Sequence, residues 1–302
     1  YYERQRQRQA WEARQADERR REELGRQIAW ERRQEERRLR EEEAQRRRQE
    51  EWERRIAEEE AVEEEPEEEE VEPRRTDSGG GSLCRAFRAF LQKGVPEKPL
   101  RQAMFYLQRA QRDGTISTRS RYLAIGDFSK NSSKKRFYTL DLKNLTVSTA
   151  HVSHGGGKKS AGLPGDPNPS DGMVDRCSTR SGDGMQRVGF FKAQELYNST
   201  DHKYSWPYFS KKPRVNGMRM KGLMDGINAK ARNDGVVMHE ANYNTGAIMG
   251  RSHSCPAFRP GEGGPIMKKL TGGSLYYSYV PVCKNDMQKV ERRIQGWENF
   301  CR

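Results

Sequence analysis

Hydrophobic residues are scarce along the first 65 positions of this 302-residue chain and become periodic only from Leu83 onward. Two groups then recur at helical spacing on either side of Pro96: Leu83, Phe87, Phe90 and Leu91, followed by Leu100, Met104 and Leu107. This spacing predicts two short amphipathic helices. We expect their aromatic side chains to pack in a core rather than to contact a ligand.

The pattern changes to β-rich runs after Thr118. Residues 136–142 and 145–152 flank Lys143-Asn144 and predict a hairpin. Further strands are predicted at 189–193, 218–223, 236–239 and 274–282. Helical spacing returns over 286–297. The long Gly/Pro/Ser/Asp-rich loop at 158–183 is interpreted as a wall of a substrate cleft, since long loops in compact domains are usually functional or disordered.

The predicted fold class is therefore mainly β with short helices, preceded by a long charged α-helical or partly disordered N-terminal arm. Residues 1–65 are mostly Arg, Glu, Gln and Ala, which are strong helix formers. Opposite charges recur at i,i+4, as in Glu36–Arg40, and each such pair adds ~0.2–0.5 kcal/mol. The apolar residues keep no heptad, which argues against a coiled coil. The arm is either a spacer or docking segment for a protein partner, or a solvated low-complexity tail.

Composition divides the chain at the same place. The predicted domains are the arm (1–65), an acidic and Gly/Ser-rich linker (66–82), a helical lead-in (83–116) and a main domain with a C-terminal helix (117–302). Residues 1–75 contain 20 Arg and 26 Asp or Glu, a net charge of −6, whereas the remainder carries +19. A strongly basic domain attracts polyanions. Nucleic acid and the anionic polymers of a cell envelope are both candidates.

Several function classes find no support in the sequence. No apolar run is long enough for a transmembrane segment, and the start, Tyr1-Tyr2-Glu3, shows no signal peptide. No P-loop or dinucleotide fingerprint accompanies the glycines, and no Cys-x2-Cys or His-x3-His spacing marks a metal site. Neither a cofactor nor a metal is expected. Zinc-finger, ribonucleoprotein and basic-zipper patterns are also missing, which makes nucleic acid the less favoured partner.

The cysteine count is odd, with Cys84, Cys177, Cys255, Cys283 and Cys301. In an exported protein this leaves one thiol, which would be Cys255 if the others pair. We expect Cys283 to pair with Cys301 across the last predicted helix. In a reducing compartment all five would remain thiols.

The candidate chemistry lies in residues 235–243 and 250–258. His239 ends an apolar, strand-like run, and Cys255 follows sixteen residues later in a Gly/Ser-rich turn before Pro256. A nucleophilic cysteine needs an imidazole to take its proton, a turn that leaves the sulfur accessible, and N–H groups where an oxyanion forms. A lone cysteine can equally be a small buried hydrophobe, so spacing alone leaves both interpretations open.

The segment Gly250-Arg-Ser-His-Ser-Cys255 resembles the nucleophile signature of L,D-transpeptidases, in which a related subfamily carries Gly-Arg-Ser-x-Gly-Cys-Pro-Ala. His239 stands where that family has a His-Gly pair. Similar stretches continue in the family's order over roughly residues 83–282, among them 122–129, 135–142, 152–155, 189–191, 217–223 and 272–279. Ser254 and Glu240 depart from the pattern by replacing glycines. Serine restricts backbone angles that glycine permits, so Ser254 bears on the oxyanion geometry.

This resemblance implies a β-rich catalytic domain that acts on peptidoglycan stem peptides outside the cytoplasm, in the periplasm or cell wall, without a metal. The Cys255 thiolate would attack the amide after the third stem residue, and His239 would act as the base. Ser254 would belong to the oxyanion turn. The products would be free D-alanine and a 3–3 cross-link or an exchanged D-amino acid. We expect a carbonyl of the 252–254 turn to orient His239.

Supporting roles are predicted for the neighbours of these residues. Ser252 would hydrogen-bond within the turn, Arg251 would hold a stem-peptide carboxylate through its planar fork of donors, and His253 would touch substrate. Each has an ordinary structural alternative. The remaining candidates for the cleft wall are Asn242, Tyr243 and His154.

Two other classes of protein remain open. One is a non-catalytic wall-binding or scaffold protein with a degenerate transpeptidase-like domain, which the two departures would suggest. The other is a nucleic-acid-binding protein, which the basic charge would suggest.

Overall fold

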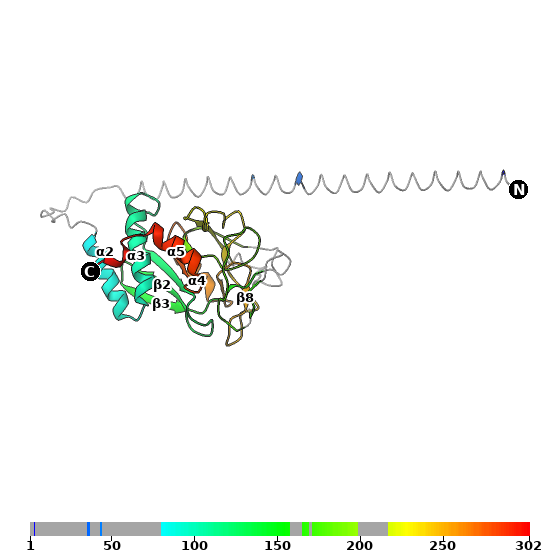
Figure 1. Ribbon diagram of the computed structural model, residues 1–302, viewed down its shortest axis with the longest axis horizontal. Coiled ribbons are helices and arrows are strands. Elements are labelled where there is room, and N and C mark those ends of the chain that lie inside the picture. The colour runs from blue at the N-terminus through cyan, green and yellow to red at the C-terminus, as the bar shows by residue number, and fades with distance from the viewer. Residues whose placement is uncertain are drawn as a thin grey trace. The chain divides into compact units, whose positions relative to one another are not determined.

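The computed structural model describes residues 80–157, 165–168, 171–198 and 217–302, together with Glu3, Glu35, Glu36 and Glu43. The chain divides into two compact units, Tyr1–Arg75 and Thr76–Arg302. Apart from those four glutamates, the predicted arm at 1–65 lies outside the described residues, as does most of the linker at 66–82. The described helices and strands of Figure 1 belong to the second unit.

Eight strands of the second unit form one mixed sheet in the order β3-β2-β1-β10-β5-β6-β7-β9. These are β1 Tyr122–Asp127, β2 Phe137–Asp141, β3 Thr146–Ala150, β5 Gly189–Tyr197, β6 Gly217–Gly222, β7 Val237–Glu240, β9 Ala257–Phe258 and β10 Leu275–Tyr279. The β1–β10 and β7–β9 pairs are parallel, and the other neighbours are antiparallel. A second, parallel pair joins β4 His154–Gly155 to β8 Arg251–Ser252. The mainly β prediction is confirmed.

The local patterns predicted most of these elements. The hairpin around Lys143-Asn144 is present as β2 and β3, and Asp141 accepts hydrogen bonds from the N–H groups of both turn residues at 3.1 Å. Strand β5 runs on to Tyr197, four residues beyond its predicted end, and β10 is shorter than predicted. Within the described part of the 158–183 loop, residues 165–168 and 171–183 form no helix or named strand.

Four α-helices pack around the described sheet. They are α2 Gly80–Gln92, α3 Glu97–Arg112, α4 Gly263–Leu270 and α5 Lys284–Arg293, and a 3-10 turn, η2, follows at Trp297–Asn299. The two predicted lead-in helices are α2 and α3, and the predicted tail helix is α5 with η2. Helix α4 was not predicted. No helix among the described residues has the length and apolar character that crossing a membrane requires.

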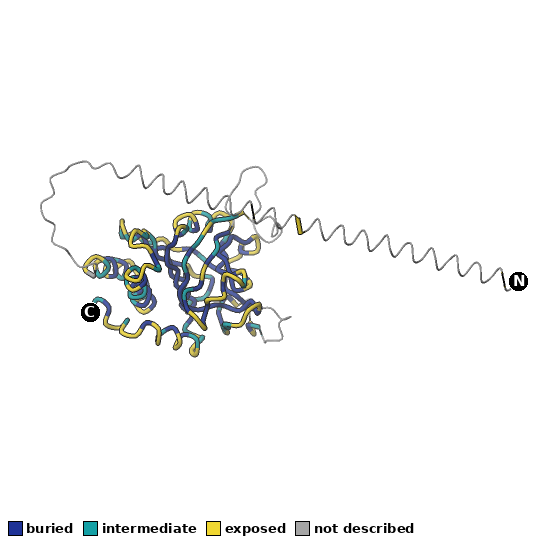
Figure 2. The backbone as a smooth tube through the Cα atoms, turned by 90° about the horizontal axis from the view of Figure 1, so that it is seen from above, coloured by how far each residue is buried: buried dark blue, intermediate teal, exposed yellow. Residues whose placement is uncertain are grey.

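The core lies between the helices and the central strands, where Figure 2 shows many buried stretches of the chain in dark blue. Tyr106 of α3 stacks on Phe190 of β5 with ring centroids 3.9 Å apart, and Phe190 stacks on Tyr277 of β10 at 4.3 Å. Phe87 and Phe90 of α2 are 2% and 0% exposed. The lead-in aromatics are therefore core residues, as predicted.

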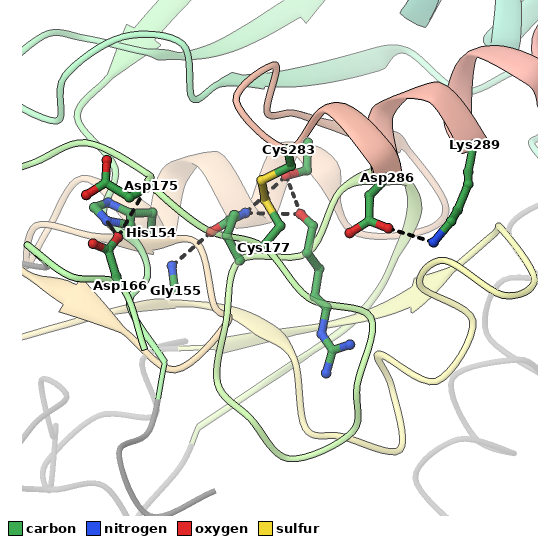
Figure 3. Close-up of a disulfide and its surroundings, with 11 residues drawn as sticks. His154, Gly155, Asp166, Asp175, Cys177, Cys283, Asp286 and Lys289 are labelled. Atoms are coloured by element: carbon green, nitrogen blue, oxygen red, sulfur yellow. Dashed lines mark hydrogen bonds and ion pairs between the residues drawn. A yellow bond between two sulfur atoms is a disulfide. The ribbon is translucent and has the colours of Figure 1, made fainter. Parts of the chain in front are cut away.

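The predicted Cys283–Cys301 disulfide is wrong. Cys84 of α2 pairs with Cys301, and Cys177 pairs with Cys283 (Figure 3). Cys283 stands at the N-terminal end of α5, whose ten residues span about 15 Å, and Cys301 follows eight residues after the C-terminal end of that helix. Both cysteines instead find partners that are distant in sequence. Cys255 lies outside both disulfides and keeps its thiol.

Candidate active site

His239 is held on β7, where every residue is buried. Its Nδ1 lies 2.8 Å from the carbonyl oxygen of Glu240. A carbonyl can only accept, so Nδ1 carries the proton and the Nε2 of the neutral ring presents a lone pair. The predicted orienting carbonyl in the 252–254 turn is therefore wrong, because the next residue along the strand supplies it.

Cys255 lies beside this histidine through the parallel pairing of β7 with β9. His239 pairs with Ala257, and its N–H donates to the carbonyl of Pro256 at 3.2 Å. Val237 and His239 are two residues apart on one strand, so their side chains share a face of the sheet. Cys255 packs against Val237 and is 7% exposed. The thiol and the imidazole therefore belong to the same face.

The thiol also contacts the start of this strand, since Cys255 Sγ lies 3.9 Å from the carbonyl oxygen of Gly235. This is a long contact to a weak donor.

The turn that carries Cys255 is fixed by hydrogen bonds from both sides. The Ser252 hydroxyl contacts the carbonyls of Cys255 and of His154, and the N–H of Ser254 donates to the carbonyl of Gly184 at 2.9 Å. A Cβ on Gly155 would lie 2.7 Å from the Cα and N of Ser254. Only glycine fits at 155, because the two backbones touch there.

Ser254 has a left-handed φ of +67°. This conformation favours glycine, which explains the glycine of the resembled signature at this position. The serine adopts this left-handed conformation all the same. Its N–H is occupied by Gly184 and is not available to an oxyanion.

Glu240 is the second departure and is 2% exposed. Its Oε1 accepts hydrogen bonds from the N–H of Gly261 at 2.9 Å and of Gly264 at 2.8 Å. Both groups lie at the N-terminal end of α4, where Glu262 makes no side-chain cap. The Glu240 carboxylate takes the place of that cap, and a negative charge there is favoured by the helix dipole.

Two tyrosines flank the thiol. Tyr197, at the end of β5, packs against the pair formed by Val237 and Cys255. Burial raises the pKa of Tyr197 and of Tyr243, and the negative charge of a Cys255 thiolate raises both further. Both phenols are therefore neutral near pH 7.

His154 does not border a cleft and is 0% exposed. Its Nδ1 accepts from Nη2 of buried Arg136 at 3.1 Å, and its Nε2 lies 3.5 Å from a carboxylate oxygen of Asp166. Figure 3 shows the ring beside Asp166 and Asp175. Burial, followed by the charge of Arg136, lowers the pKa of His154 to about 3. The predicted cleft role is wrong because the side chain is enclosed in the interior by these partners.

The other predicted residues lie at the surface around the turn. Arg251, His253 and Asn242 are exposed, and Tyr243 exposes 40% of its surface. The Nη1 of Arg251 reaches the carbonyl of Gly157 at 3.4 Å. These side chains can meet a ligand, whereas Ser252 and Ser254 are buried.

Sequence reasoning missed three supporting residues. Tyr197 lies past the apolar part of its strand, so only the extended pairing of β5 with β6 reveals it. Asn244 donates to the carbonyl of Ala257 at 3.0 Å, and Gln186 accepts from the N–H of Gly155 at 2.9 Å. Isolated amides carry no pattern in sequence. Within the described residues, no group of three or more His, Cys, Asp or Glu is arranged to hold a metal ion.

Comparison with known proteins adds one finding. Residues 91–279 match the model of a family described as L,D-transpeptidase catalytic domain. This range covers more than half of the chain and includes His239 and Cys255. No curated protein and no solved structure matches the chain.

Proposed function

Since this chain belongs to the L,D-transpeptidase catalytic domain family, we propose that it is a peptidoglycan L,D-transpeptidase with Cys255 as nucleophile and His239 as general base. One observation carries the assignment of roles. The Nδ1–H of His239 donates to the Glu240 carbonyl, so Nε2 is the basic nitrogen of the ring, and the thiol lies on the same face of the sheet.

The first half-reaction forms a thioester. Cys255 Sγ attacks the carbonyl carbon of the amide after the third stem-peptide residue, and the thiol proton moves to Nε2 of His239. When the tetrahedral intermediate collapses, the C–N bond breaks. The imidazolium returns its proton to the leaving nitrogen, and D-alanine departs as a neutral amine.

The second half-reaction resolves the thioester. The amine of a second stem peptide, or of a free D-amino acid, attacks the thioester carbonyl and gives a proton to His239. Collapse breaks the C–S bond and restores the thiol. A stem-peptide amine gives the 3–3 cross-link, a D-amino acid gives exchange, and water gives hydrolysis.

The surface around the site fits a charged peptide substrate. Arg251 is the donor we assign to a stem carboxylate, and Tyr243, Asn242 and His253 line the approach to Cys255. Ser252 and Ser254 hold the turn rather than contact substrate. The net charge of +19 on residues 76–302 favours association with anionic envelope polymers.

An extracytoplasmic location, in the periplasm or cell wall, is part of the proposal. The domain contains two disulfides. Disulfides form and persist in oxidising compartments and are rare in reducing ones. Peptidoglycan lies in the same compartment.

The test is mass analysis of muropeptides after incubation with the purified protein. Wild type is expected to release D-alanine and form 3–3 dimers, and Cys255→Ala and His239→Gln are expected to lose at least ~10²-fold in rate, the usual contribution of a general base. His151→Gln, a histidine outside the site, serves as the matched control and should match wild type.

Identical muropeptides from wild type and Cys255→Ala would defeat the proposal. Selective labelling of Cys255 by a carbapenem or by iodoacetamide provides a second readout. A protein whose Cys255 takes up neither reagent would instead fit the non-catalytic scaffold.

A further inference from the structure

Glu240 occupies a position that connects two parts of the site. Its carboxylate is bound to the N-terminal end of α4, and its main-chain carbonyl is bound to Nδ1–H of His239. The resembled signature has glycine here, which has no side chain to make the first connection. Resting on the proposed function, we infer that Glu240 is a positioning residue that sets the orientation and charge state of His239.

The geometry of the carboxylate supports this inference. Two N–H groups, of Gly261 and Gly264, converge on the same oxygen at 2.9 and 2.8 Å. A Cβ on Gly263 would lie 2.8 Å from Cγ of Glu240, so the turn closes directly on the side chain. Among the described residues, no salt bridge joins Glu240 to a lysine or arginine. The negative charge is stabilised by the backbone instead.

The same contacts fix the peptide that binds the histidine. Anchoring of the side chain restrains the main chain of Glu240, and the carbonyl of that residue determines which ring nitrogen carries the proton. Glu240 follows His239 on β7, so the two side chains point to opposite faces of the strand, and the buried carboxylate acts on the imidazole across it. It favours the imidazolium that forms when the thiol proton is taken up, because charges in a water-poor site interact strongly.

Other ionisable groups surround β7 and must be held constant in any test. They are Arg219 and Lys221 on β6, Glu262, Lys268 and Lys269 at α4, Tyr197 on β5, Tyr243, and His253 and Cys255 before β9. Glu240→Gln removes the charge and leaves an oxygen that can accept both N–H groups, while all of these groups stay in place.

The experiment compares wild type, Glu240→Gln and Glu240→Ala in two assays. One is the rate of Cys255 alkylation by iodoacetamide from pH 5 to 9, which needs no substrate. The other is kcat and KM for stem-peptide turnover. Glu240→Gln is expected to lower the alkylation rate at pH 7 and kcat by about tenfold each, less than loss of the general base itself. KM should change by less than about twofold, since substrate contacts are retained.

Glu262→Gln is the matched control, because Glu262 lies at the cap position of the same helix and pairs with Arg259 only at 4.0 Å. It should keep the wild-type alkylation profile. A purely structural role would lower the melting temperature of Glu240→Gln while its alkylation profile and kcat per folded molecule remained those of wild type, and that result would overturn the inference.

The two proposals fail separately. If wild type makes no cross-linked product, the proposed function fails, and the alkylation profile still decides the role of Glu240. If turnover is confirmed and the Glu240→Gln profiles do not move, only the inference about Glu240 fails.

Discussion

The buried imidazole of His154 makes the stability of this domain sensitive to acid. Its pKa is lowered to about 3 by burial and by the charge of Arg136, against 6.5 for the ordinary group. The native state therefore holds the neutral ring at a pH where the unfolded chain binds a proton. Its contribution to stability is complete above pH 6.5 and is lost as the pH falls towards 3.

The size of the effect follows from the two pKa values. Between pH 7.5 and 5.0 the unfolded histidine becomes almost fully protonated while the native one does not. At about 1.4 kcal/mol per pH unit below 6.5, the loss is about 2 kcal/mol at pH 5. Burial raises the pKa of the neighbouring Asp166. The stability that this carboxyl group contributes is therefore lost as the pH rises, which is opposite to the pH dependence of the His154 contribution.

Comparison with His154→Gln isolates the imidazole, because glutamine can accept from Arg136 and donate to Asp166 but does not titrate. Free energies of unfolding are measured by urea titration at pH 7.5 and 5.0, without reductant. Between pH 7.5 and 5.0 the free energy of unfolding of wild type should fall by about 2 kcal/mol more than that of the variant. The exposed histidine His253→Gln is the control and should keep the wild-type dependence. Equal losses in wild type and His154→Gln would show that the native ring protonates as easily as the unfolded one.

Three further predictions concern the framework of the site. Ser254→Gly should raise the free energy of unfolding by about 0.5–1 kcal/mol, since relief of the left-handed φ exceeds the entropy cost of glycine; a decrease in urea titration would contradict this. Gly155→Ala should lower the free energy of unfolding by about 1–3 kcal/mol and slow Cys255 alkylation, because the added Cβ meets the backbone of the turn that carries Cys255. Gly246→Ala is the control: this position has room for a Cβ, so the variant should stay close to wild type in both assays. The double variant Cys84→Ser/Cys301→Ser should have a free energy of unfolding about 2–5 kcal/mol lower than that of wild type. Peptide mapping under non-reducing conditions should detect only the Cys177–Cys283 disulfide in this variant. An unchanged urea midpoint would refute the stabilising role of the Cys84–Cys301 disulfide.

Periodicity predicted the elements whose formation is decided locally. The apolar spacing in α2 and α3 and the alternation around the β2–β3 turn repeat every few residues. The type of element can therefore be predicted from the local sequence. Helix α4 escaped prediction because it begins Gly263-Gly-Pro, a turn-like sequence. Its N-terminal end is capped by a carboxylate that lies 23 residues earlier in the chain, on β7.

The wrong predictions for the disulfides and for His154 also concern contacts between residues that are distant in sequence. The disulfide partners of Cys283 and Cys301 are 106 and 217 residues away in sequence, and spacing along the chain contains no information about them. His154 looked accessible beside three glycines, yet Arg136 and Asp166 enclose it. The candidate pair Cys255 and His239 was marked by a resemblance and not by a periodicity.

The two departures from the family signature bear most directly on whether the domain is degenerate. Ser254 adopts the left-handed bend for which glycine is preferred, at a modest cost in strain. Glu240 still presents its main-chain carbonyl to His239 and adds an anchored carboxylate. A decaying site would be expected to lose the orienting contact of the proposed base or the bend of the proposed nucleophile turn. Here both are retained, so these two residues no longer give a reason to prefer a non-catalytic scaffold.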